Sequence, residues 1–395
     1  MSINPYRPGA GMEPQYLAGR ESDINNINKV LEAISLGFPA RSVVYYGLRG
    51  VGKTVLLNKV KSLARQKNIP IERLEIIESK SVFNQQITLC IFKLINKLSV
   101  KSKITNFIKD ALGLLKAFSI KYKCNDFDIE VAPIKGVSDT GILSNDITEL
   151  FTALGEIAQQ QNKGVVITID EIQYIKDFEF EALMEAIHIV NQQGFPIVIF
   201  AAGLPKIAKI AGDIKSYAER LFEFIEIDSL DKQSATLALT EPAKRLNIEF
   251  SPDSIDYIFD ITQGYPYFLQ EYGKWIWEQD ENLTFVDLDI TKKAYNDFIN
   301  SLDKSFFKVR NDRATQREIE FMVAMASVNK LPCSTKDVAK IMNEPIQRIS
   351  PIRAQLIHKG FIYSIKRGEI NFTVPQFDKY LKRTYDLYFK LCSIS

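Results

Sequence analysis

The sequence predicts an α/β protein with a mostly parallel sheet, followed by a helical domain and a small C-terminal domain of helices and a hairpin. Wholly apolar segments such as "GVVITID" and "FPIVIFAAG" alternate with helical patterns, as expected of strands that helices cover on both faces. Beyond Leu230 the strand patterns stop, and helical patterns continue to about Leu302. After Leu302 the patterns predict three helices followed by a hairpin.

The core elements follow one another along the chain. Apolar residues at helical spacing predict a helix over 23–35, and "SVVYYG" predicts a buried strand that leads into a glycine-rich loop. "TVLLNKVKSLARQ" predicts a helix, "IPIERLEIIE" a second strand and "VFNQQITLCIFKLINKLS" another helix. From Lys101 to about Val137 an amphipathic helix and alternating segments replace this pattern, so we expect an insertion in the core there.

The last section predicts a winged helix-turn-helix. "TQREIEFMVAMASV" and "STKDVAKIM" are helical patterns, and "EPIQRISPIRAQLIHKG" is a third helix that ends at Gly360. "FIYSIKRGEINFTV" is typical of two strands joined at Lys366, Arg367 and Gly368. Helix, helix, helix and hairpin is the order of elements in a winged helix-turn-helix.

Composition excludes several kinds of site. The 395 residues are 46% hydrophobic and 25% charged, and no apolar run is long enough to cross a bilayer, so we expect a cytoplasmic protein without membrane contact. The four cysteines have no short pair spacing, which argues against a zinc site or a disulfide framework. Only His188 and His358 could supply histidine chemistry. A net charge of +2 is too small to imply a polyanionic partner, so any nucleic-acid argument rests on local patches.

A glycine-rich loop between a strand and a helix predicts a phosphate site. The segment "GLRGVGKT" fits the pattern G-x-x-x-x-G-K-[ST]. Glycines let successive N–H groups turn toward phosphate oxygens, and the following helix adds the positive end of its dipole. We expect Lys53 to reach the β- and γ-phosphates and Thr54 to bind Mg²⁺. The residues expected to hold the nucleotide here are Gly47, Gly50, Val51, Gly52, Lys53, Thr54 and Val55.

Two carboxylates follow the strand in "GVVITIDEIQ". Asp170 is expected to hold Mg²⁺, and Glu171 to orient or deprotonate the attacking water. The alternative is an acidic helix start, which the helix dipole would stabilise.

These motifs, the helical domain and the terminal winged helix together resemble the AAA+ ATPases of the replication-initiator (origin-recognition-like) branch and the related STAND ATPases. The resemblance spans essentially the whole chain. It implies a P-loop AAA+ core over 1–229 with an insertion at about 101–137, a helical lid over 230–303 and a winged-helix domain over 304–395. It also implies ATP or ADP and Mg²⁺ as cofactors.

Three further segments carry parts of the resemblance. "LAGRE" resembles the entry segment that borders adenine, which makes Leu17 to Arg20 candidate base-pocket residues; the alternative is a plain helix start. "SYAERLFEFIEI" resembles the segment with an arginine finger, so Arg220 would meet the γ-phosphate of a neighbouring subunit, unless it is an exposed helix-end arginine. Gly264 and Pro266 in "TQGYPYFLQEYG" resemble the G-x-P motif, whose proline packs against adenine; the alternative is a simple turn.

Two departures from the family pattern predict slow hydrolysis. AAA+ enzymes usually have a polar sensor residue at the end of the strand after the carboxylates, whereas this chain has "FAAGLP". The helical domain shows no clear sensor arginine near "GYPY". We therefore expect a nucleotide-controlled switch rather than a motor.

Basic residues in the winged helix predict contact with duplex DNA. Between Pro345 and Arg367 the sequence has five cations and no Asp or Glu: Arg348, Arg353, Lys359, Lys366 and Arg367. Five phosphate contacts would give a salt slope of roughly four to five. Winged helices also serve as docking or dimerisation modules, so a solvated basic face is the alternative. A second basic tract, Lys101 to Lys123, could follow DNA or bind a partner.

Two functions follow from the sequence. One is an ATP-dependent protein that engages duplex DNA, with Arg220 coupling subunits of a homo-oligomer. The other is a STAND-like regulatory ATPase whose winged helix docks a protein effector, for instance in a defence or toxin system. A metabolic P-loop kinase would leave the helical and winged-helix domains without a role.

Overall fold

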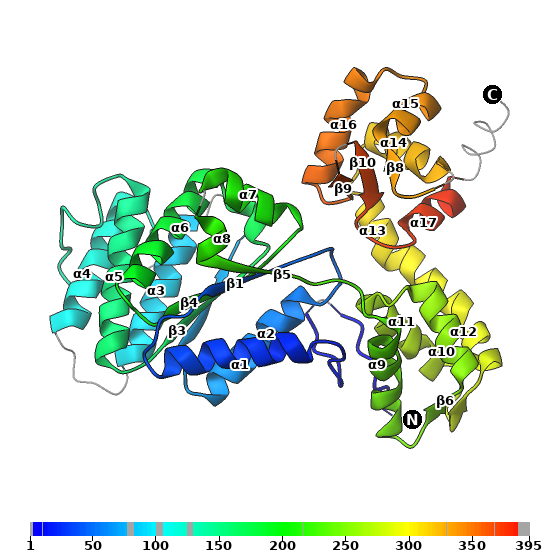
Figure 1. Ribbon diagram of the computed structural model, residues 1–395, viewed down its shortest axis with the longest axis horizontal. Coiled ribbons are helices and arrows are strands. Elements are labelled where there is room, and N and C mark those ends of the chain that lie inside the picture. Colours follow the sequence, from blue (N-terminus) through cyan, green and yellow to red (C-terminus); the bar gives the residue numbers. More distant parts are fainter. Residues whose placement is uncertain are drawn as a thin grey trace. The chain divides into compact units, whose positions relative to one another are not determined.

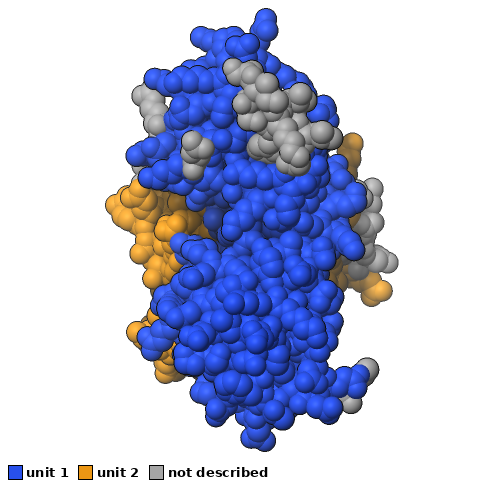
Figure 2. All heavy atoms as spheres, turned by 90° about the vertical axis from the view of Figure 1, so that its right-hand side faces the viewer, with its two compact units in different colours: residues 1–19, 48–51, 228–395 blue, residues 20–47, 52–227 orange. Residues whose placement is uncertain are grey.

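The computed structural model describes residues 3–9, 11–76, 83–99, 106–124, 129–215, 217–328, 330–366 and 368–385. The chain forms two compact units (Figures 1 and 2). The sheet unit comprises residues 20–47 and 52–227, and the helical unit comprises residues 1–19, 48–51 and 228–395. The three-domain division made from the sequence stays a prediction.

A five-stranded parallel sheet forms the centre of the sheet unit, in the order β2-β3-β4-β1-β5. The predicted parallel sheet is therefore confirmed. Its strands are β1 (Ser42–Tyr46), β2 (Ile71–Glu75), β3 (Val165–Asp170), β4 (Ile197–Gly203) and β5 (Phe222–Glu226). β1, β3 and β4 are buried almost throughout, as strands covered on both faces must be.

Helices cover both faces of this sheet (Figure 1). Val44, Ile167 and Ile199 belong to a large apolar core with α3, α4, α5 and α6. On the opposite face, next to α1 and α2, the rings of Tyr45 and Phe200 stack with their centroids 6.5 Å apart. The helices of this unit are α1 (Glu21–Ser35), α2 (Lys53–Gln66), α3 (Phe83–Ser99), α4 (Asn106–Lys121), α5 (Leu143–Gln160), α6 (Asp177–Gln192), α7 (Lys206–Ile214) and α8 (Ala218–Leu221).

Helices also dominate the first part of the helical unit: α9 (Lys232–Lys244), α10 (Pro252–Thr262), α11 (Pro266–Trp277), α12 (Leu288–Ser301) and, after a π-helical turn over Leu302–Phe307, α13 (Lys308–Asn311). Phe268 lies at its centre, with the rings of Phe298 and Phe307 at about 6 Å. The sequence predicted no strand in this region, and that expectation was wrong. β6 (Glu249–Phe250) and β7 (Phe285–Val286) pair in parallel, but strands of two residues are too short to produce a periodic pattern.

The N-terminal segment packs on the same helices. The hydroxyl of Tyr6 donates to the carbonyl of Leu239 at 2.6 Å, and burial raises the pKa of Tyr6. A Cβ at Gly273 would lie 2.6 Å from the Tyr6 ring, so only glycine admits this packing.

The C-terminal elements follow in the predicted order, helix, helix, helix and hairpin. They are α14 (Gln316–Ser327), β8 (Cys333–Ser334), α15 (Thr335–Ile341), α16 (Ile346–His358), β9 (Ile362–Lys366), β10 (Glu369–Phe372) and α17 (Phe377–Thr384). β8, β10 and β9 form an antiparallel sheet in that order. Thr315 and Glu318 close a capping box at the start of α14, which supplies two backbone N–H groups with partners.

The packing of α1 against the start of β3 generates a stability prediction. An ideal Cβ on Gly164 would lie 2.6 Å from the backbone oxygen of Ile34, at the end of α1. We expect Gly164→Ala to lower the free energy of unfolding by about 1–3 kcal/mol, because a backbone atom must move. Gly212→Ala, in α7 with no atom within 4 Å of the new methyl group, is the control. It should leave stability unchanged or raise it by up to about 1 kcal/mol. Equal thermal unfolding midpoints of the two variants would contradict the packing argument.

Candidate functional site

The glycine-rich loop joins the carboxyl end of β1 to the first turn of α2. Gly47 N–H donates to the carbonyl of Gly203 at 3.2 Å, so the loop starts beside the end of β4. Gly52, the last residue before α2, has a φ of 101°, a conformation that a side chain would strain. Lys53 Nζ donates to the carbonyl of Gly47 at 2.9 Å, which places the ammonium group beside the start of the loop. This local geometry is that of an anion site at a helix N-terminus.

Asp170 lies opposite the first turn of α2, at the end of β3. Thr54 Oγ1 donates to its Oδ2 at 2.9 Å, and the Asp170 side chain is 13% exposed. A hydroxyl and a carboxylate oxygen in contact, beside a lysine, are the hard donors that Mg²⁺ takes together with substrate phosphates. The residues therefore fit the metal that the fold implies, with Thr54 and Asp170 as its protein ligands.

Arg73 is a neighbour of this site that the sequence did not predict. It comes from β2, and its guanidinium lies 3.3 Å from Asp170 Oδ2. Asp170 thus has a cationic partner as well as Thr54. The only sequence signal was a charged residue inside the strand pattern "IERLE".

Glu171 follows Asp170 in a left-handed backbone conformation, with φ 51° and ψ 41°. Its N–H donates to Asp170 Oδ1 at 2.9 Å, and a 3₁₀ turn over Ile172–Tyr174 begins directly after it. The Gln173 side chain donates to the Glu171 carboxylate. Gln173 is the second site residue that the sequence reasoning missed.

In the helical unit, Leu48–Val51 lies against the predicted G-x-P segment. The hydroxyl of Tyr265, the middle residue of that segment, donates to the carbonyl of Arg49. Burial raises the pKa of Tyr265, so the hydroxyl keeps its proton and remains a donor. Gly264 has a φ of 68°, and Pro266 begins α11. The contact of Pro266 with adenine stays a prediction.

The predicted base-pocket residues divide between the two units. Leu17 to Gly19 belong to the helical unit, where a Cβ on Gly19 would lie 2.7 Å from Ser234 Oγ. Arg20 precedes α1 in the sheet unit. Contact of these residues with the base also stays a prediction.

Arg220 lies in α8, directly before β5, and is exposed. β5 runs parallel to β1, with Phe222 opposite Ser42, whereas the glycine loop follows the other end of β1. Five strand residues separate these two edges of the sheet, or about 16 Å. The guanidinium of Arg41 donates to the carbonyls of Glu219 and Phe222, on either side of Arg220.

The predicted DNA-contacting cations have different surroundings. Lys359 forms an ion pair at 2.7 Å with the buried Glu318 of α14. Lys366 pairs with Glu369 at 3.0 Å, and Arg353 donates to Ser364 Oγ at 3.2 Å. Arg348 is exposed on α16, and Arg367 lies outside the described residues.

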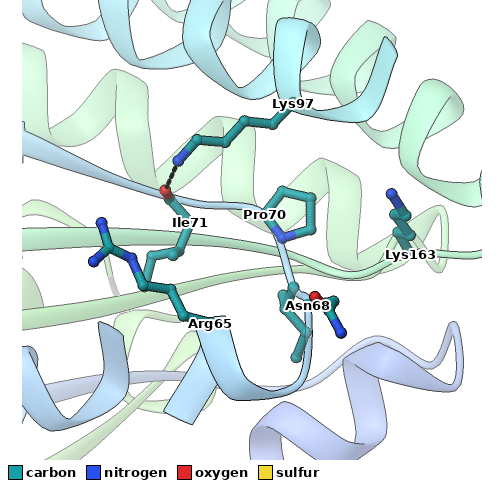
Figure 3. Close-up of a pocket in the computed structure, with 7 residues that line it drawn as sticks. Arg65, Asn68, Pro70, Ile71, Lys97 and Lys163 are labelled. Carbon is teal, nitrogen blue, oxygen red and sulfur yellow. Dashed lines mark hydrogen bonds between the residues drawn. The ribbon is translucent and has the colours of Figure 1, made fainter. Parts of the chain in front are cut away.

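A hollow of about 350 Å³ lies at the opposite edge of the sheet from the glycine loop, beside the start of β2 (Figure 3). Its lining residues are Arg65, Asn68, Ile69, Pro70, Ile71, Lys97 and Lys163. Arg65 and Lys97 stand in the last turns of α2 and α3, where cations complement the helix dipoles. Lys97 also donates to the carbonyl of Ile71 at 2.6 Å and pairs with Glu72 at 2.7 Å. These structural roles explain the presence of Arg65 and Lys97, two of the three cationic side chains that line the hollow.

Within the part of the chain that the structure describes, no helix is long and apolar enough to span a membrane. The same residues contain no group of three or more His, Cys, Asp or Glu side chains placed to hold a metal ion.

Comparison with known families divides the chain into two matched segments. Residues 16–200 match a family model described as "AAA ATPase domain". Residues 304–381 match one described as "Domain of unknown function (DUF8462)". No curated protein matches the chain.

A solved structure shares this fold, and others are similar to the chain at lower scores. The Walker-type ATPase PABY2304 of Pyrococcus abyssi is 14% identical and aligns over 95% of this chain and 98% of its own, with a TM-score of 0.61. The chain is also similar to the Orc1 protein of Aeropyrum pernix in complex with DNA, at 13% identity, 96% and 95% coverage and a TM-score of 0.48. The RuvB Holliday junction branch migration motor of Thermotoga maritima aligns at 15% identity over 94% of this chain and 99% of its own, with a TM-score of 0.44.

The position of Lys53 generates a binding prediction. We expect Lys53→Ala to weaken ATP binding by about 10- to 100-fold, because a hydrogen bond to a charged group contributes roughly 1.5–3 kcal/mol. Lys61→Ala, an exposed position of the same helix, should bind normally. Titration with a fluorescent ATP analogue would measure both, and unchanged affinity of Lys53→Ala would contradict the assignment of the loop.

Proposed function

Because residues 16–200 belong to the AAA ATPase domain family, we propose that this protein binds ATP with Mg²⁺, hydrolyses it slowly and acts as a nucleotide-controlled switch on duplex DNA. The observation that carries the proposal is the contact of Thr54 with Asp170, beside Lys53 and Glu171 at one edge of the sheet. Phosphate, metal and attacking water need these groups within a few ångströms of one another.

Each residue has a role in this proposal. Lys53 and the loop N–H groups neutralise phosphate charge, which is where most of the catalysis of phosphoryl transfer arises. Thr54 and Asp170 would hold the metal, which would supply positive charge to the phosphates. Glu171 orients the attacking water and accepts its proton.

Slow turnover is part of the proposal. The end of β4 is Ala201, Ala202 and Gly203, so the strand offers no polar side chain to the γ-phosphate. Fast multi-turnover hydrolysis by the protein alone would contradict this part.

Assembly would complete the site through Arg220. Its place at the opposite edge of the sheet from Gly47 supports action on the nucleotide of a neighbouring copy rather than on its own. A guanidinium in that position would stabilise the charge of the transition state. Hydrolysis should then rise with protein concentration.

The C-terminal domain is the proposed DNA-binding part. Its three helices and small antiparallel sheet support a winged helix-turn-helix, in which α16 would enter the major groove. Gln347, Arg348, Ser350 and Gln355 are exposed on α16 and could reach base edges or phosphates. Because Lys359 and Lys366 already pair with carboxylates, a salt slope of about three fits better than the four to five expected from sequence.

One observation favours a docked protein effector as the second candidate. Ile346 at the start of α16 and Ile365 in β9 are 40% and 47% exposed, and apolar side chains suit a protein partner better than phosphates. The pairing of Lys359 also removes one cation from the α16 face.

Hydrolysis is tested by Glu171→Gln. We expect ATP binding to be retained and single-turnover hydrolysis to fall by about 10²–10⁴-fold, the usual contribution of a general base. Glu156→Gln, an exposed position of α5, is the control. Normal turnover by Glu171→Gln would show that another group serves as the base.

DNA binding is tested by fluorescence anisotropy of a labelled random duplex, with no nucleotide, with ADP and with a non-hydrolysable ATP analogue, at two salt concentrations. We expect Arg348→Ala to weaken binding and to lower the salt slope by about one. Lys340→Ala, exposed on α15, should behave as the wild type. Absence of binding in every nucleotide state would favour the docked effector.

A further inference from the structure

Gln173 supplies the polar group at the carboxyl end of β4 that the strand itself lacks. It lies in the 3₁₀ turn two residues after Glu171 and is 8% exposed. Its Oε1 accepts a hydrogen bond from Leu204 N–H, the first residue beyond β4, at 3.0 Å. The side chain therefore bridges the turn after β3 and the end of β4.

The orientation of this side-chain amide follows from its partners. Leu204 N–H can only donate, so the atom that faces it must be the carbonyl oxygen of Gln173. The Nε2 group then faces Glu171, whose carboxylate accepts from it. Exchange of the two amide atoms would place donor against donor and acceptor against acceptor. The network thus fixes a nearly buried donor beside the candidate base.

Gly203 leaves the space that this bridge needs. An ideal Cβ there would lie 3.0 Å from Gln173 Oε1 and 2.9 Å from Ile172 Cγ2. The carbonyl of the same glycine accepts from Gly47 N–H at 3.2 Å. The single peptide group between Gly203 and Leu204 therefore contacts the start of the glycine loop through its carbonyl and reaches Glu171 through its N–H and the side chain of Gln173.

We propose that Gln173 is a positioning residue that holds the Glu171 carboxylate in the orientation used for ATP hydrolysis. The proposal rests on the function proposed above. A glutamate side chain has three rotatable bonds, so its carboxylate needs a fixed partner to stay near one position. A misplacement of 1 Å can cost about 100-fold in rate. Gln173 provides that partner from a nearly buried position.

Two substitutions distinguish the two hydrogen bonds of Gln173, the one with Leu204 N–H and the one with the Glu171 carboxylate. Gln173→Glu keeps an acceptor for Leu204 N–H but places a carboxylate, which cannot donate, against Glu171. Gln173→Met keeps the approximate volume and removes both hydrogen bonds. We expect both variants to lower single-turnover ATP hydrolysis by about 10- to 100-fold, with unchanged Kd for ATP. Hydrogen exchange at Leu204 should stay slow in Gln173→Glu and become faster in Gln173→Met.

A double-mutant cycle distinguishes positioning from a general loss of structure. In the Glu171→Gln background neither substitution should lower the rate further, because the group that Gln173 positions is already lost. Wild-type rates in both single variants, or a full additional loss in the Glu171→Gln background, would overturn the proposal. If the wild-type protein does not hydrolyse ATP at all, the proposed function fails first and takes this role with it. Leu204 exchange would still report whether the bridge exists.

Discussion

The candidate site depends on the parallel pairing of β1, β3 and β4. In a parallel sheet all carboxyl ends meet at one edge, so the loop after Tyr46, the carboxylates after Ile169 and the end of β4 become neighbours although they are far apart in sequence. The bond from Gly47 N–H to the Gly203 carbonyl continues this pairing into the loop. Burial of the strands on both faces holds the edge in place, because any shift of a strand would disrupt the close packing of apolar side chains on both faces.

Local sequence patterns were sufficient to predict the main residues at this edge of the sheet. They were not sufficient to predict all of the side chains that contact those residues. The glycine loop, Asp170 and Glu171 were predictable because each motif is contiguous and strand patterns flank it. Arg73 and Gln173 were not, because Arg73 contacts Asp170 at the end of β3 and Gln173 contacts Leu204 just beyond β4, and only the sheet order brings these residues together. β6 and β7 were missed for a different reason, since two residues carry no period.

Counting charged residues along the sequence also failed to predict the charge environment of the C-terminal domain. The segment from Pro345 to Arg367 contains no carboxylate, yet Glu318 of α14 meets Lys359 and Glu369 meets Lys366. Burial favours the protonated form of Glu318, but its hydrogen bonds with Lys359 and Thr315 more than offset this and lower its pKa. Lys359 therefore stabilises the fold of the domain, and its substitution would report on stability as well as on any ligand.

The two edges of the sheet also bear on how the proposed switch would work. Glu171 and Lys53 stand at one edge, whereas Arg220 and the carbonyls that Arg41 holds stand at the other. A single chain could then bind a nucleotide at its first edge and present an arginine only to another molecule at its second. In such an arrangement binding needs one copy and fast hydrolysis needs two, so assembly would control turnover. The absence of a polar side chain at the end of β4 fits this division, because Gln173 at that position contacts Glu171 rather than the nucleotide, and an arginine from another copy would add positive charge at the phosphate to that of Lys53.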